Sequence, residues 1–404
     1  MTSTMSSRER MMAAMTLNGP DHVPFSPYIG QGPWYEKPLF WHDQFQRTEV
    51  MLELGLDPTI DIWLPWPHPA PEVKIKTWRA TGGSEPLLTK EYHTPAGILR
   101  QTVRETEDWC DARHTRWIPT TMGTEQREQF NMDILDDWNI SRRSEPWVKG
   151  RDDLEALRYL MRVPEGHVLE EWKMDTARAL EFARKHDLVS VARRTIVGDA
   201  FQWFCDIEQF MIWMIEDTGF VKEFLGIWQE WSLAMTKLAL EAGVDVVQRR
   251  GWYEIPTFWG LKYFKEYLVP LIEEETKMVH AAGKLHVYLL PEGQGAYTPL
   301  LKEMSADVMM GVDPRMLHGG DLKSLFQAMG NNKAFWGGVN AEVTLESGKP
   351  EIIDEAVKTA IEELGGNGGL ILGGFIFQQI TAEMITMMIA SWKKYREMHA
   401  VRRG

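Results

Sequence analysis

Residues 244–289 read VDVVQRRGWYEIPTFWGLKYFKEYLVPLIEEETKMVHAAGKLHVYL. The stretch begins with the short apolar run 244–247, continues through a helical pattern over 261–282, and ends with a second apolar run over 284–289. A short strand, a longer helix and another short strand are typical of a βαβ unit with parallel strands. This stretch therefore predicts an α/β fold.

The same alternation continues on both sides of this unit and predicts a barrel. At least six strand–helix units occupy the last ~220 residues, a length that suits βαβ units. Adding a strand at 23–25 and one strand from the segment before residue 147 gives about eight. That number favours a closed (β/α)8 TIM barrel over an open doubly wound sheet. We expect one domain over 1–404, with an irregular strand-and-loop insertion at about 33–147.

Composition excludes several classes of protein. The 404 residues include 44 Lys and Arg against 58 Asp and Glu, and the formal net charge of −14 argues against binding to nucleic acid or to an anionic membrane. Two cysteines exclude a disulfide framework and a multi-cysteine metal site. No apolar run reaches ~18 residues and the N-terminus does not resemble a signal peptide, so we expect a cytoplasmic protein.

The barrel prediction places the active site just beyond the carboxyl ends of the strands. Known motifs for dinucleotides, nucleotide triphosphates, zincin-type zinc and a serine nucleophile are absent. The candidates are therefore the polar and aromatic residues at strand ends. They are Arg249, Arg250, Trp252 and Glu254 after 244–247, His286 and Tyr288 in 284–289, Asp313 after 306–310, Glu342 after 334–339, and Phe375 after 369–372.

Each of these candidates has a functional and a structural interpretation. His286 and Tyr288 lie two positions apart and point to one side of the sheet; if this is the interior, His286 could bind a metal or transfer a proton, and otherwise it is a core histidine. Glu254 could be a metal ligand, an acid with a raised pKa, or a solvated loop residue. Arg249 or Arg250 could bind a substrate carboxylate or form an internal salt bridge.

The order of several short motifs resembles that of the uroporphyrinogen decarboxylase superfamily. The segment NGPDHVP at 18–24 is similar to the family's entry to its first strand, and EYHTPAGIL at 91–99 is similar to a later family segment. The resemblance implies a (β/α)8 barrel. Further segments that resemble family motifs are 197–201, 242–248, 264–270 and 286–288.

Departures from the family pattern indicate a subfamily. The segment YIGQGPW at 28–34 has no arginine where true uroporphyrinogen decarboxylases bind propionates, and Gly374 and Phe375 replace a late histidine and glycine. Tyr288 stands at a cysteine position of the thiol-directed zinc methyltransferases, so a thiolate zinc site is not expected. The remaining resemblance is to corrinoid-dependent methyltransferases that cleave phenyl methyl ethers.

This resemblance implies an O-demethylase. The enzyme would transfer the methyl group of a methoxylated aromatic compound to the Co(I) centre of a corrinoid (cobalamin) carried by a separate protein. His286 and Glu254 would bind Zn²⁺, which polarises the ether oxygen, with Asp313 or Glu342 as a third ligand. Tyr288 could instead donate a proton to the phenolate.

The substrate ring would be held by aromatic and basic side chains. Arg249 or Arg250 would orient a ring carboxylate where the substrate has one. The candidates for stacking on the ring are Trp63, Trp66, Trp252 and Phe375.

Two other functions remain open from the sequence. The first is a metal-free decarboxylase of an aromatic or tetrapyrrole-like acid. The second is a non-catalytic binding module that has kept the barrel. Relatives of this fold often pair, so a homodimer is possible in each case.

Overall fold

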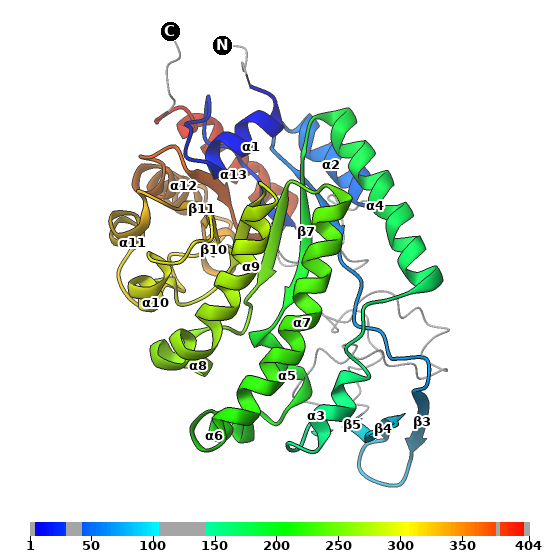
Figure 1. Ribbon diagram of the computed structural model, residues 1–404. Coiled ribbons are helices and arrows are strands. Elements are labelled where there is room, and N and C mark those ends of the chain that lie inside the picture. Colours follow the sequence, from blue (N-terminus) through cyan, green and yellow to red (C-terminus); the bar gives the residue numbers. More distant parts are fainter. Residues whose placement is uncertain (1–4, 30–42, 105–142, 377–379, 400–404) are drawn as a thin grey trace.

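A curved sheet of parallel strands forms the centre of the computed structural model, which describes residues 5–29, 43–104, 143–376 and 380–399 (Figure 1). Seven strands pair in the order β12-β11-β10-β9-β8-β7-β2, all in parallel. Each strand is short because a helix follows it. The strands are β2 (Thr59–Trp63), β7 (Val189–Ile196), β8 (Val246–Arg250), β9 (Leu285–Leu289), β10 (Val308–Val312), β11 (Ala334–Gly338) and β12 (Leu370–Gly373).

The segment 24–29 closes this sheet into a barrel. On one side Phe25 forms a parallel bridge with Leu372, and β1 (Tyr28–Ile29) pairs with β13 (Phe375–Ile376). On the other side the Asp57 amide, just before β2, donates to the Phe25 carbonyl at 2.9 Å. The segment therefore lies between β12 and β2 as the eighth strand, and the predicted α/β TIM-barrel fold is confirmed.

Helices surround the barrel, and α7 (Thr218–Ala242) shows how the sequence sets their bounds. The Asp217 side chain accepts from the Phe220 amide at 3.0 Å to cap the first turn, and Gly243 ends the helix with φ +91°. The buried side chains recur every three or four positions and face the sheet. The other helices of this layer are α2 (Gln44–Glu53), α4 (Gly166–His186), α8 (Pro256–Tyr263), α9 (Val269–Ala281), α10 (Gln294–Leu301), α11 (Leu322–Met329), α12 (Pro350–Leu364) and α13 (Ala382–Tyr395).

The amino-terminal end of the barrel is closed by α1 (Ser7–Met15), which lies at the top of Figure 1. Ser6 and Glu9 form a capping box that starts this helix. Met11, Ala14 and Met15 then pack on the first inward-facing residues of the strands, in a cluster that excludes the helix layer. Access to the interior is therefore from the opposite end, where the strands terminate.

An antiparallel sheet covers part of the carboxyl end, at the bottom of Figure 1. Its strands pair in the order β3-β4-β5-β6. The predicted insertion at about 33–147 contains this sheet, but α2 and β2 fall in the same range and belong to the barrel. The strands are β3 (Lys74–Ala80), β4 (Leu87–Thr94), β5 (Gly97–Arg104) and β6 (Arg143–Glu145).

Three further helices follow this sheet in the chain, and α3 packs against β5. They are α3 (Asp153–Arg158), α5 (Phe201–Phe204) and α6 (Ile207–Glu216). Among the helices that the structure describes, none is both long enough and apolar enough to cross a membrane.

The packing of α1 in the barrel end predicts a large cost for shortening Met11. Its side chain is fully buried in the interior cluster, so Met11→Ala leaves a cavity and should lower the free energy of unfolding by about 2–5 kcal/mol. Met174→Ala, on the exposed face of α4, serves as the control and should change it by less than about 0.5 kcal/mol. Urea unfolding followed by circular dichroism measures both; equal effects would show that α1 does not seal the barrel.

Candidate active site

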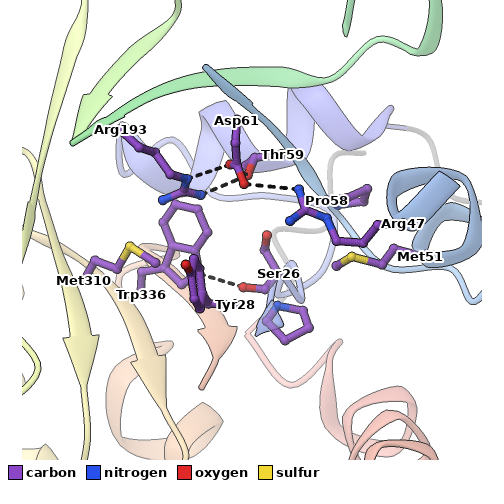
Figure 2. Close-up of a pocket in the computed structure, with 11 residues that line it drawn as sticks. Ser26, Tyr28, Arg47, Met51, Pro58, Thr59, Asp61, Arg193, Met310 and Trp336 are labelled. Carbon is purple, nitrogen blue, oxygen red and sulfur yellow. Dashed lines mark hydrogen bonds and ion pairs between the residues drawn. The ribbon is translucent and has the colours of Figure 1, made fainter. Parts of the chain in front are cut away.

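Two adjoining hollows lie inside the barrel, toward the carboxyl ends of its strands. They share the side chains of Tyr28, Met310 and Trp336. Figure 2 shows the first hollow, in which Arg47, Asp61 and Arg193 approach one another. The first is further lined by Ser26, Pro27, Arg47, Met51, Pro58, Thr59, Asp61 and Arg193, and the second by Gly311, Val312, Asp313, Gly337, Val339 and Gly374.

The Asp61 carboxylate is the centre of the polar wall of the first hollow. Arg193 Nε donates to Asp61 Oδ1 at 2.6 Å, and Arg47 Nη2 donates to Asp61 Oδ2 at 3.1 Å (Figure 2). Burial raises the pKa of Asp61, but the charges of Arg193 and Arg47 oppose burial and hold the pKa below its ordinary value. Asp61 is therefore a carboxylate at neutral pH and carries a fixed negative charge.

A half-buried carboxyl group borders the second hollow. Asp313 follows β10; its Oδ2 accepts from Asn340 Nδ2 at 2.7 Å, and its Oδ1 accepts from the Arg315 amide at 2.8 Å. Burial raises the pKa of Asp313, and the nearby charge of Glu342 raises it further against these two hydrogen bonds. Asp313 is thus more readily protonated than an exposed aspartate, while Glu342 itself is exposed.

The loops after β7 and β8 meet at the rim of the barrel through Asp199. Its carboxylate accepts from the Trp252 amide at 3.0 Å and the Tyr253 amide at 2.5 Å, and Arg250 Nη1 lies 3.3 Å from it. Burial raises the pKa of Asp199 to about 7, a shift that Arg250 opposes and Glu254 reinforces. The contacts fix the position of Arg250 and Trp252, whose ring packs against the interior cluster.

A second polar network lies outside the interior, between the sheet and the helices. Arg249 Nη2 lies 3.2 Å from Glu254 Oε1, Arg249 Nη1 lies 3.1 Å from Glu275 Oε2, and the Tyr288 hydroxyl donates to Glu254 Oε2 at 2.7 Å. The Glu254 carboxylate also accepts from the Gly198 amide at 2.8 Å. A Cβ at position 198 would lie 2.6 Å from this carboxylate, so glycine is needed for the approach.

His286 belongs to the same wall network. Its Nδ1 lies 2.7 Å from Thr276 Oγ1, whose hydroxyl donates to the Ile272 carbonyl, so the ring carries its proton on Nδ1. Nε2 has no hydrogen-bond partner among the described residues and lies 4.0 Å from Glu275 Oε2. Burial lowers the pKa of His286 to about 4 although the Glu275 carboxylate opposes the shift. His286 is therefore a neutral, fully buried residue of the wall.

Comparison with known proteins finds a match to one family model. Residues 203–395, which run from α5 to the end of α13, match the model described as uroporphyrinogen decarboxylase (URO-D). This part of the chain is therefore similar to that family, and the predicted resemblance is confirmed over this range. The comparison with curated proteins finds no significant match.

One solved structure shares the fold of the whole chain. A methyltransferase from Methanosarcina mazei is 17% identical, covers 97% of this chain and 99% of its own, and superimposes with a TM-score of 0.56. A muconate lactonizing enzyme from Pseudomonas putida is 8% identical, covers 81% of this chain and 78% of its own, and has a TM-score of 0.27. The first likeness supports the fold of the chain as a whole, and the second is too weak to support an argument.

The structure corrects the expected position of His286 and Tyr288. Along β9 the inward residues are Val287 and Leu289, which join the interior cluster, so the two polar residues face the helices. Arg249 likewise faces outward, and its salt bridges are internal, to Glu254 and Glu275. None of these side chains is exposed to the interior.

The residues predicted to bind zinc do not come together. His286 and Glu254 belong to the wall, whereas Asp313 borders the second hollow and Glu342 is exposed. Within the described parts of the chain, no three His, Cys, Asp or Glu side chains have an arrangement that could hold a metal ion. The predicted ligand set therefore does not fit a zinc site.

The aromatic residues predicted to stack on the substrate ring lie in different parts of the structure. Trp63, at the end of β2, is 40% exposed, and Trp66 is half-buried against the helix-layer core. Trp252 lies at the rim. The backbone of Phe375 forms part of β13, and its side chain lies outside the described residues.

Sequence reasoning missed the residues that line the first hollow. Val189, Val191 and Arg193 alternate on one side of β7, and Thr59 and Asp61 do the same on β2. This alternation was a usable signal, since it extends an apolar inward face into a charged one. Arg47 lies on α2 and carries no such signal.

The neutral state of buried His286 predicts a pH dependence of stability. The pKa of His286 is about 4 in the folded chain and 6.5 in the unfolded chain. Between these pH values only the unfolded chain takes up the proton, so the free energy of unfolding decreases as the pH is lowered. When the pH is lowered from 7 to 5, His286 should account for about 2 kcal/mol of the loss in unfolding free energy, and His286→Gln should abolish this part of the loss. Urea unfolding at the two pH values measures it.

The control for this experiment is the exposed His167 on α4. His167→Gln should show the same pH dependence as the unmodified chain because this ring is solvated. If His286→Gln keeps the full dependence on pH, the folded chain binds a proton at His286 and the neutral assignment is wrong.

Proposed function

We propose that this protein transfers the methyl group of a methoxylated aromatic compound to a corrinoid carried by a separate protein. The observation that carries the proposal is the second hollow, where two aromatic side chains, Tyr28 and Trp336, stand beside the half-buried carboxyl group of Asp313. The match of residues 203–395 to the family model and the fold shared with a methyltransferase support an enzyme of this type.

The chemistry of demethylation assigns a role to Asp313. The bond between methyl carbon and aryl oxygen breaks, the electron pair stays on oxygen, and the departing aryloxide needs a proton. When bound, the corrinoid supplies a cobalt nucleophile that accepts the methyl group. Asp313, whose pKa is raised by burial, donates its proton to the ether oxygen and so stabilises the leaving group.

The walls of the hollows would position the ring. Tyr28 and Trp336 line both hollows, so a planar ring between them can present a substituent to each. The Trp336 indole is itself held, because its Nε1 donates to the Ser26 carbonyl at 2.7 Å. The corrinoid protein would dock at the carboxyl end of the barrel, since α1 closes the other end.

A decarboxylase is the second candidate, and one observation favours it. The guanidinium groups of Arg47 and Arg193 line the first hollow and could hold a carboxylic acid substrate. Decarboxylation of an aromatic acid would release CO₂ and leave the methoxy group in place. Analysis of the products therefore separates the two functions.

The role of Asp313 predicts a large loss of activity in Asp313→Asn. The amide keeps the size of the side chain and cannot supply the proton, so the rate of methyl transfer should fall by about 10²–10⁴-fold. The rate is followed by the absorption of methyl-cobalt on incubation with reduced cobalamin and a panel of methoxyarenes. Asp175→Asn, on the exposed face of α4, should keep the full rate.

The same experiment tests the proposal as a whole. No methyl-cobalt with any methoxyarene in the unmodified protein, or CO₂ release instead, would overturn the proposed function. Full activity in Asp313→Asn would leave methyl transfer intact and remove Asp313 as the proton donor.

A further inference from the structure

The first hollow contains more positive than negative charge. Asp61 is the carboxylate shared by two guanidinium groups, from Arg47 on α2 and Arg193 on β7 (Figure 2). The side chains are 2%, 8% and 5% exposed, respectively, so little solvent screens them. Among the described residues that line this hollow, one negative charge faces two positive charges, which leaves a net charge of about +1 in a largely buried place.

The two arginines differ in how many of their donors are used. Arg193 donates from Nε to Asp61, from Nη1 to Gln248 and from Nη2 to Thr59 Oγ1 at 3.3 Å. Among the described residues, Arg47 makes one side-chain hydrogen bond, to Asp61. A guanidinium has five N–H donors. Arg47 therefore brings unused donors to the wall of the hollow.

The surroundings of Tyr28 show the same surplus. Its ring lies 5.8 Å from the Arg193 guanidinium and lines both hollows. The charged groups that act on its hydroxyl are Arg193, Arg47 and Arg250 against Asp61. Arg250 lies at the rim, 3.3 Å from Asp199. The positive charges on the wall of the first hollow itself are those of the Arg47–Arg193 pair.

A buried surplus charge is costly unless a counter-ion balances it. A carboxylate suits this place, because its two oxygens match the fork of donors on a guanidinium and its charge restores neutrality. A neutral ring substituent would leave the charge unbalanced. A cation would be repelled by both arginines.

We propose that Arg47 binds the carboxylate of an aromatic acid in the first hollow. The ring lies between Tyr28 and Trp336, and a second substituent extends into the second hollow toward Asp313. Taken with the proposed function, on which this last step rests, the substrate class is a methoxylated benzoate rather than a neutral methoxyarene. Arg47 thus determines specificity for the acid.

Binding of an acid and its neutral amide tests the proposal without turnover. Isothermal titration with 4-methoxybenzoate and 4-methoxybenzamide should show at least about tenfold tighter binding of the acid to the unmodified chain, the range of one good charge-assisted contact. Arg47→Gln should abolish this preference and leave the amide affinity within about twofold. Arg158→Gln, at a partly exposed arginine on α3, is the matched control and should keep the preference.

A second variant covers the case in which Arg47→Gln does not fold, which circular dichroism detects. Arg47→Lys keeps the charge but not the fork, so the affinity for the acid should fall about three- to tenfold with the amide unchanged. An unchanged affinity for the acid in either folded variant would overturn the proposal. So would a wild-type chain that does not prefer the acid, including one that binds neither compound.

The outcome is separable from that of the methyl-transfer assay. A preference for the acid that depends on Arg47, without methyl transfer to cobalamin, would keep the carboxylate site and remove the proposed function. Methyl transfer from acids and amides alike would keep the function and remove the carboxylate site.

Discussion

Each side chain of a strand in a closed parallel barrel faces either the interior or the helix layer, and the direction alternates at every residue. On β8 this places Gln248 and Arg250 toward the interior and Arg249 in the wall. On β9 it places Val287 inside and His286 outside. If a strand were shifted by one residue, the side chains that face the interior and those that face the helix layer would change places. The chemistry that the barrel can perform therefore depends on the phase of each strand as much as on its composition.

The wall network holds the loops that border the site. Glu254, in the loop after β8, accepts from the Gly198 amide in the loop after β7, and it is held in turn by Arg249 and Tyr288. Next to this contact Asp199 accepts from two amides of the β8 loop. The two loops are therefore joined at both positions, and the rim residues Arg250 and Trp252 are fixed before any ligand binds.

The sequence predicted the fold more completely than the site. Periodicity gave the βαβ units, and the motif order gave the resemblance to the superfamily. The phase of β9 could not be read, because both faces of a parallel barrel strand are buried. KLHVYL alternates between polar and apolar residues, but the sequence does not tell which set faces the interior and which faces the helices. Arg47 could not be predicted as a site residue for another reason. It lies on a helix, and it contacts Asp61 only in the closed barrel. Where a strand did alternate visibly, as from Val189 to Arg193, the site residue could have been found.

The two polar layers of the barrel differ in the sign of their charge. In the wall one guanidinium, of Arg249, faces two carboxylates, of Glu254 and Glu275; in the interior two guanidinium groups face the single carboxylate of Asp61. The wall is packed between sheet and helices, so neighbouring hydrogen-bond donors such as the Tyr288 hydroxyl must stabilise its surplus negative charge. The interior is hollow, and a molecule that enters it can balance the surplus positive charge. The same pairing of arginine and acid thus builds a fixed support in one layer and a selective binding surface in the other.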